Sequence, residues 1–420
     1  MTTTIGGEGA PYDVAIVGGG IVGICTALSL VERGRRVVLI DQNEPGQGAS
    51  YGNAGVISPW SIVPQAMPDV WKKLPGMILR SDGPASVMPR RMLRYLPWLV
   101  RFLGAAQPDK VCRVSAAMHL LCGEAPFLYR QHLKGTGKEH LVQDSYYVHA
   151  CRNPADANLN SLGNQLRADK GAEIERIEAG DLRDLEPALS PAFQAAILIK
   201  GQARAVNPGG IGTALAEKFR GQGGHIQRQR VTGLHKTAHG WRVALQGDDI
   251  ATQKVAVTAG GWSVQLLKEI GYDAPLAAER GYHVMAPDAD ISFNHSVMDV
   301  DNYIVASSME HGVRFSGMAE FAAPDDPPTK RRHTVMRKLA AGMAPGVNLQ
   351  NAQDWMGVRP SFPDSLPVIS AIPDQPGLFA AFGHSHYGLM MAPKTGQLAA
   401  DLITDMKSNH DLGMYAADRF

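Results

Sequence analysis

The chain has 420 residues, of which 45% are hydrophobic and 19% charged, and 41 basic against 40 acidic side chains give a net charge of +1. Because this length is about three times that of a usual single domain, we expect two packed units. The even charge balance excludes the concentrated basic surface that nucleic acid binding requires.

The cysteines and the N-terminal sequence indicate where in the cell the protein is expected. The four cysteines show neither a CxxC pair nor zinc-site spacing, so we expect reduced, buried thiols and no metal. Residues 1–10 lack the basic and apolar regions of a signal peptide, which predicts a cytoplasmic protein. No stretch of about 18 apolar residues is present to span a bilayer as a helix.

The first predicted elements are a buried strand over 13–17, a helix over 21–33 and a second strand over 36–40 that ends on Asp41. Strand, helix and strand in this order predict a parallel βαβ unit that opens a doubly wound sheet.

Three glycines, Gly18, Gly20 and Gly23, form a GxGxxG pattern between the first strand and the helix. The first permits a tight turn, the second lets the backbone approach a pyrophosphate, and the third lets helix and strand pack closely. The helix N-terminus offers N–H groups to that pyrophosphate. Asp41 lies where a carboxylate accepts hydrogen bonds from ribose hydroxyls. The pattern predicts a dinucleotide site but does not separate NAD from FAD.

Residues 89–106 mix arginines with bulky apolar residues at near-helical spacing. This composition is typical of a helix in a membrane interface and also of a helix packed on its own domain with its arginines reaching outward. We favour the second interpretation. The first would place the protein peripherally on the inner face of the cytoplasmic membrane.

Further along the chain, short strands are predicted at 143–150, 195–200, 280–286, 303–307 and 313–318, which suggests a mostly antiparallel second sheet. Strands at 251–258 and 378–382 and an amphipathic helix over 393–406 then return to the character of the nucleotide-binding part.

A loop rich in small residues, 46–58, follows Asp41. Together with the glycine pattern it resembles the D-amino acid oxidase superfamily of flavoproteins, above all bacterial D-amino acid and D-hydroxyproline dehydrogenases. Residues 258–263 are similar to the family's AAGxWS strand end, and 383–390 to its turn at the pyrimidine end of the flavin. There, N–H dipoles stabilise the negative charge of reduced flavin.

The resemblance implies an α/β fold with an α+β substrate part. A Rossmann-like FAD-binding domain over 11–58, 151–184, 205–275 and 366–420 would interleave with a mostly antiparallel-sheet substrate-binding domain over 59–150, 185–204 and 276–365. The implied cofactor is non-covalent FAD. Its implied contacts come from the glycine pattern, the small-residue loop, two strand ends and the C-terminal turn: Gly18, Gly20, Ile21, Val22, Gly23, Asp41, Gln42, Ala49, Ser50, Asn53, Ala54, Gly55, Val56, Ile57, Val231, Thr258, Ala259, Gly260, Trp262, Gly383, His384, Gly388, Leu389 and Met390.

Two further segments carry the predicted substrate contacts. Residues 357–360 resemble the family's GLRP segment, so that Arg359 would clamp the substrate carboxylate with two parallel hydrogen bonds; a surface salt bridge is the alternative. Residues 279–283 resemble the strand opposite the flavin, where Tyr282 would bind the carboxylate or pack in the core, and His283 would face the amine. His384 and His386 would border the cavity or be structural. The predicted catalytic residues are therefore Arg359, Tyr282, His283 and His384.

The reaction implied is dehydrogenation of a small D- or cyclic amino acid by hydride transfer from Cα to flavin N5. The imino acid would then hydrolyse in water, or its imine would stay in the ring of a cyclic substrate. No lysine lies between Lys268 and Lys330, the segment expected to face the flavin, whereas some oxidases of the family place a lysine there. This favours a dehydrogenase that passes electrons to a quinone or other acceptor. The alternatives are an oxidase of the glycine or sarcosine oxidase type that uses dioxygen, an NAD-linked dehydrogenase, and a flavin-bound sensor or electron-transfer subunit.

Overall fold

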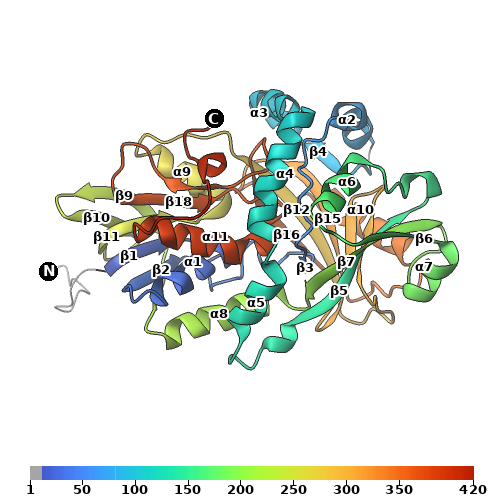
Figure 1. Cartoon of the computed structure of the whole chain (residues 1–420), viewed down its shortest axis with the longest axis horizontal. Coiled ribbons are helices and arrows are strands. Elements are labelled where there is room, and N and C mark those ends of the chain that lie inside the picture. The colour runs from blue at the N-terminus through green and yellow to red at the C-terminus, as the bar shows by residue number, and fades with distance from the viewer. Residues whose placement is uncertain (1–11, 81) are drawn as a thin grey trace.

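The structure, a computed structural model, describes residues 12–80 and 82–420, and its two β-sheets lie side by side along the long axis (Figure 1). The nine strands predicted from the sequence are all present. Helices α4 (Pro108–Cys122) and α5 (Ala125–Leu133) cross the boundary between the sheets. One continuous apolar core joins these two helices to residues of both sheets, so the two halves pack directly on each other.

The eight-stranded sheet has the order β17-β18-β11-β1-β2-β8, with β10 paired to β11 and β9 to β10. Its central pairs are parallel. The central strands are almost wholly buried runs of apolar residues, as expected of a parallel sheet that is covered on both faces. The strands are β1 (Tyr12–Val17), β2 (Val37–Asp41), β8 (His225–Arg228), β9 (Val231–Thr237), β10 (Gly240–Leu245), β11 (Ile250–Val257), β17 (Val368–Ala371) and β18 (Leu378–Phe382).

The ten-stranded sheet has the order β16-β12-β15-β14-β13-β5-β7-β3, with β4 paired to β15 and β6 to β7. Only its β13–β5 and β15–β4 pairs are parallel, which confirms the mostly antiparallel sheet predicted from the sequence. The strands are β3 (Val56–Ile57), β4 (Ala85–Val87), β5 (Val142–Cys151), β6 (Ile174–Glu178), β7 (Ala195–Ala205), β12 (Ala277–Ala286), β13 (Ser296–Asp299), β14 (Ile304–Met309), β15 (Gly312–Phe321) and β16 (Gln353–Ser361).

Helices cover both sheets. In the eight-stranded half, α1 (Ile21–Val31) packs against both α8 (Pro208–Gly221) and α11 (Gly388–Ile403). The remaining helices are α2 (Val70–Leu79), α3 (Met92–Ala105), α6 (Leu162–Asp169), α7 (Ala179–Leu185), α9 (Ser263–Lys268) and α10 (Lys330–Met343), and the short 3₁₀ turns are η1 (Pro89–Arg91), η2 (Glu139–Leu141), η3 (Pro154–Asp156), η4 (Gly260–Trp262) and η5 (Gly413–Tyr415). Among the described residues, no helix combines the length and apolarity needed to cross a bilayer.

Two predictions about chain organisation need correction. Segment 151–184 was expected with the nucleotide-binding part, but its strand β6 pairs with β7 in the ten-stranded sheet, Ile174 opposite Ile199. The last helix begins at Gly388, not at 393. Pro393 lies inside this helix and has no N–H for the carbonyl of Leu389, which instead accepts a hydrogen bond from the Tyr129 hydroxyl at 2.6 Å.

Candidate active site

A cavity of about 2000 Å³ runs between the two sheets, from the glycine-rich turn after β1 to strands β12 and β16. Cavities for drug-sized ligands hold roughly 300–1,000 Å³, so this one has room for an extended dinucleotide and a second molecule. Most of the predicted cofactor residues line it: Gly18, Gly20, Ile21, Val22, Asp41, Gln42, Ala49, Ser50, Asn53, Ala54, Val56, Val231, Thr258, Ala259, Gly260, Trp262, Gly383, His384, Gly388, Leu389 and Met390. Gly23, Gly55 and Ile57 are not among the lining residues, so their roles are in packing behind the wall.

The turn after β1 is shaped for close approach of the backbone to a ligand. Gly18 has φ +116°, and a Cβ there would lie 2.6 Å from the carbonyl carbon of Thr258. A Cβ on Gly23 would lie 1.9 Å from the carbonyl oxygen of Gly18. The Thr258 hydroxyl donates to that same oxygen at 2.8 Å, and the Ser50 hydroxyl accepts from the Ile21 N–H at 3.1 Å. The N-terminus of α1 is thus held at the cavity wall, where its dipole favours an anion.

Asp41 ends β2 on the same wall. Its carboxylate accepts hydrogen bonds from the backbone N–H groups of Gly19 at 2.7 Å and Asn43 at 2.8 Å, one on each oxygen. A carboxylate has about four acceptor positions, so this one retains capacity for a ribose hydroxyl pair while its orientation is fixed.

The C-terminal turn and the start of α11 form the other end of the cofactor-sized space. Gly383 has φ +89°, and a Cβ there would meet the Phe362 ring at 2.1 Å. The Ser385 hydroxyl is buried and has no hydrogen-bond partner among the described residues, as expected for a group that awaits a ligand. The first intrahelical bond of α11 comes from the Met391 N–H, so the three N–H groups before it have no acceptor within the helix. These donors suit the electron-rich pyrimidine end of a flavin.

The side chain of Arg359, on β16, lies flat across the neighbouring strand β12. A Cβ on Gly281 would lie only 2.3 to 2.7 Å from three atoms of the Arg359 side chain, so only glycine leaves room for it. Its Nη1 donates to Glu279 Oε1 at 3.0 Å and to the Met318 carbonyl at 2.6 Å, and its Nη2 donates to the Gly317 carbonyl at 3.3 Å. Nε has no partner among the described residues, and the side chain lines the cavity. The guanidinium is therefore held in one orientation and keeps an N–H group free to donate to a ligand.

Glu279 anchors this wall. Its carboxylate is 2% exposed and accepts hydrogen bonds from Arg359, from the Ser361 hydroxyl at 2.9 Å and from His386 Nε2 at 2.5 Å. Burial raises the pKa of Glu279, but the charges and hydrogen bonds of His386, Arg359 and Ser361 outweigh burial and lower the pKa to about 2. One buried carboxylate thus holds two basic side chains at the cavity. The sequence around Glu279 predicted a strand and gave no sign of this anchoring role.

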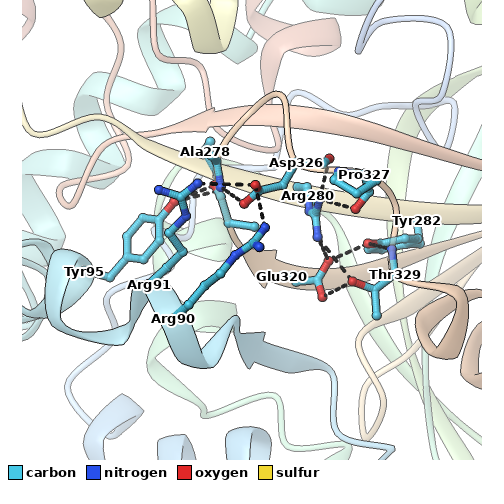
Figure 2. A network of polar contacts seen from close by, with 12 residues as sticks. Arg90, Arg91, Tyr95, Ala278, Arg280, Tyr282, Glu320, Asp326, Pro327 and Thr329 are labelled. Atoms are coloured by element: carbon cyan, nitrogen blue, oxygen red, sulfur yellow. Dashed lines mark hydrogen bonds and ion pairs between the residues drawn. The ribbon is translucent and has the colours of Figure 1, made fainter.

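The structure corrects the predicted role of Tyr282. Successive residues of a strand point to opposite faces, and Tyr282 points toward α10, where its ring packs edge-on against His333. Tyr282 contributes to the cavity wall, but its hydroxyl donates to Glu320 at 2.5 Å and accepts from the Thr329 N–H. Figure 2 shows it inside a polar network with Arg280 and Glu320. We therefore assign Tyr282 to the structural network.

Two predicted catalytic histidines are also held by protein groups. His283 does not line the cavity: its ring stacks on Trp355 at 4.9 Å between centroids, and its Nδ1 lies 3.2 Å from the Gly52 carbonyl. Its predicted contact with a substrate amine does not fit this position. His384 does line the cavity, but its Nε2 is 3.0 Å from the Thr395 hydroxyl, and burial lowers its pKa to about 3. It is therefore neutral and links the turn to α11.

Comparison with known proteins agrees with this geometry. Residues 13–402 match the model of the DAO family, described as FAD dependent oxidoreductase. The chain belongs to this family. It is accordingly an FAD-dependent oxidoreductase, and its fold is the one expected from the sequence.

The similar proteins extend over the full length of the chain. The chain is 33% identical over 416 residues to a D-amino-acid oxidase of Bradyrhizobium diazoefficiens, covering 97% of this chain and 98% of the relative. Glycine oxidase from Geobacillus kaustophilus superposes with a TM-score of 0.73 at 22% identity, covering 97% and 99% of the two chains. L-Proline dehydrogenase from P. horikoshii superposes with a TM-score of 0.73 at 19% identity, covering 98% of each chain. These two likenesses establish the fold.

Proposed function

We propose that this FAD-dependent oxidoreductase oxidises the amine carbon of a small D-configured or cyclic amino acid. The observation that carries the proposal is Arg359, a guanidinium fixed on the cavity wall with an unpartnered Nε–H among the described residues. Such a group binds a carboxylate by charge-assisted hydrogen bonds. The 33% identity to a D-amino-acid oxidase supports an amino acid as the substrate.

Different residues of the cavity would position the carboxylate and the amine of the substrate. Glu279, together with the space left by the missing side chain of Gly281, fixes Arg359 in one orientation, so the bound carboxylate sets the position of the substrate Cα–H. His386 shares the Glu279 carboxylate and lies beside the same wall, where it would orient the amine. The amine reacts in its neutral form, because its lone pair forms the C=N bond as hydride leaves Cα. The imino acid formed from an acyclic substrate hydrolyses in water to a keto acid and ammonia, whereas the imine of a cyclic substrate stays in the ring.

For the cofactor, the structure suggests two holding points. The N-terminus of α1 would receive the pyrophosphate and Asp41 the ribose, while the first turn of α11, with Ser385, would receive the pyrimidine edge. When bound, FAD accepts the hydride and supplies the oxidising power for the reaction.

We further propose that electrons pass to a quinone rather than to dioxygen. Lys72, which is 61% exposed, is the only lysine among the described residues that line the cavity. Helix α3 buries Trp98 and Phe102 but exposes Leu93 at 85% and Val100 at 63%, and Trp71 of α2 is 60% exposed. The two helices lie next to each other at the upper edge of the molecule in Figure 1, near the middle of its long axis. This apolar surface borders the cavity and suits peripheral contact with a membrane that contains the quinone.

Oxidation by dioxygen is the second candidate, because the 33% identical relative is an oxidase. Reduced enzyme mixed with air-saturated buffer or with a soluble quinone distinguishes the two. We expect reoxidation by the quinone to be at least tenfold faster than by dioxygen at equal concentration. The reverse order would assign the protein to the oxidases.

The substrate proposal is tested by mixing the oxidised protein anaerobically with D- and L-amino acids, including proline and hydroxyproline. We expect at least one D- or cyclic amino acid to bleach the flavin. Arg359→Ala should keep its flavin absorbance and lose at least 100-fold in the rate of bleaching at low substrate concentration, because a charge-assisted bidentate contact is lost. Arg183→Ala, an exposed arginine of α7, is the matched control. If no amino acid bleaches the wild-type flavin, the proposal is refuted.

A further inference from the structure

Among the arginines that line the cavity, Arg167 stands beside two polar side chains of β5 rather than on the wall that holds Arg359. Arg167 lies on α6, and its side chain lines the cavity. Its Nε donates to the Trp60 carbonyl at 3.2 Å and its Nη1 to the Asn164 side-chain oxygen at 2.9 Å, and both acceptors are neutral. No ion pair between described residues includes Arg167. Its positive charge is therefore not paired with a carboxylate of the described residues.

Two polar side chains of β5 line the cavity near Arg167 and have unused hydrogen-bonding capacity. The Tyr147 hydroxyl has the thioether sulfur of Met298 as its partner, at 3.4 Å, which is a weak acceptor. His149 Nε2 is buried without a partner among the described residues. Burial, and then the charge of Arg167, lower the pKa of His149 well below its usual value, so the ring is neutral. A guanidinium, a hydroxyl and a neutral imidazole thus face one part of the cavity.

A partly buried charge without a counterion is costly, and a ligand anion would remove this cost. We propose that Arg167, Tyr147 and His149 form a second anion subsite that binds the side-chain carboxylate of an acidic amino acid. This inference rests on the proposed function, in which Arg359 holds the α-carboxylate. It specifies the substrate class as α-amino dicarboxylates.

The spacing of the strands fits such a substrate. The Arg359 guanidinium bonds to carbonyls of β15, and β15 is separated from β5 by β14 and β13. Three strand spacings amount to about 14 Å. In a five-carbon dicarboxylate the two carboxyl carbons lie about 5 Å apart. With about 4 Å added at each end for hydrogen bonding, the molecule is long enough to reach from Arg359 to the part of the cavity that Tyr147 and His149 of β5 line.

The test compares each acidic amino acid with its neutral amide in the same enzyme: glutamate with glutamine, aspartate with asparagine, and 2-aminoadipate with its amide, as D- and L-forms. In the wild type we expect kcat/KM to favour the acid at least tenfold for at least one chain length. Arg167→Met should lower that ratio at least tenfold, and Arg167→Lys should lower it less. Tyr147→Phe, which removes a single hydroxyl, should lower the ratio about threefold.

A binding measurement is independent of turnover. Glutarate added to the oxidised wild-type protein should perturb the flavin spectrum with a dissociation constant at least tenfold below that of its monoamide, and Arg167→Met should abolish the difference. The proposed subsite would be refuted if the wild type had equal kcat/KM for each acid and its amide, or if Arg167→Met left the acid-to-amide ratio unchanged. This holds even if neutral amino acids reduce the flavin. Failure of all amino acids to reduce the flavin would instead overturn the proposed function.

Discussion

Replacing Glu279 by glutamine should destabilise the folded protein in a way that depends on pH. The pKa of Glu279 falls from 4.5 to about 2 in the fold. At about 1.36 kcal/mol per pKa unit, this shift corresponds to roughly 3 kcal/mol of stabilisation of the folded state at neutral pH. The carboxylate is almost fully buried, so solvent screening reduces this figure little. Glu279→Gln removes the charge that holds Arg359 and His386.

The sign of the pH effect follows from the direction of the shift. Because the pKa is lower in the folded state, the stabilisation is fully present above about pH 4.5 and is lost as the pH falls toward 2. An unfolding entropy of about 2.1 cal/mol/K per residue converts 3 kcal/mol to a decrease in Tm of about 3 to 4 °C for this chain.

The assay is thermal unfolding of the FAD-loaded protein, followed by fluorescence at pH 7, 5 and 3.5. Glu178→Gln is the control, because the side chain of Glu178 is 64% exposed and its pair with Arg176 should contribute less than about 1 kcal/mol. A wild-type Tm for Glu279→Gln at pH 7, or a decrease in Tm that did not shrink as the pH fell, would contradict a stabilising role of the Glu279 charge.

Three further substitutions separate substrate binding, folding and cofactor binding. Gly281→Ala places a Cβ 2.3 Å from the Arg359 guanidinium. In steady-state kinetics it should raise KM at least tenfold, with unchanged FAD content. An unchanged KM would show that Arg359 does not bind substrate. Tyr282→Phe should lower Tm by about 2 °C, because a hydrogen bond to Glu320 is lost, and leave KM within twofold; a large KM change would restore Tyr282 to the active site. Asp41→Asn should raise the dissociation constant for FAD about tenfold in a fluorescence titration, and wild-type affinity would exclude the ribose contact.

The sequence predicted local features well because their causes are local. The turn after β1 needs glycine at positions 18 and 23, since a Cβ at either would strike backbone atoms, and this constraint is visible as GxGxxG. The strands of the sheets were found because their residues are buried in regular patterns, and β18 has the predicted bounds.

Features set by distant contacts were missed. Glu279 is 80 residues from Arg359 and 107 residues from His386 in the sequence, and no local sequence pattern predicts these contacts. Tyr282 and His283 were both assigned a contact with the substrate although neighbouring residues of a strand point to opposite faces, and the resemblance obscured this conflict. Pro393 suggested a helix start because a compensating hydrogen bond from Tyr129 cannot be read from the sequence.

The central claim is that an amino acid held by its carboxylate gives up its Cα hydrogen to FAD. The most direct test is anaerobic stopped-flow reduction of the bound flavin by one amino acid prepared with hydrogen or with deuterium at Cα. We predict that saturating deuterated substrate bleaches the flavin several-fold more slowly, since breaking that bond is the step observed. Equal rates for the two isotopic forms at saturation, or an absence of bleaching by any amino acid, would contradict the claim.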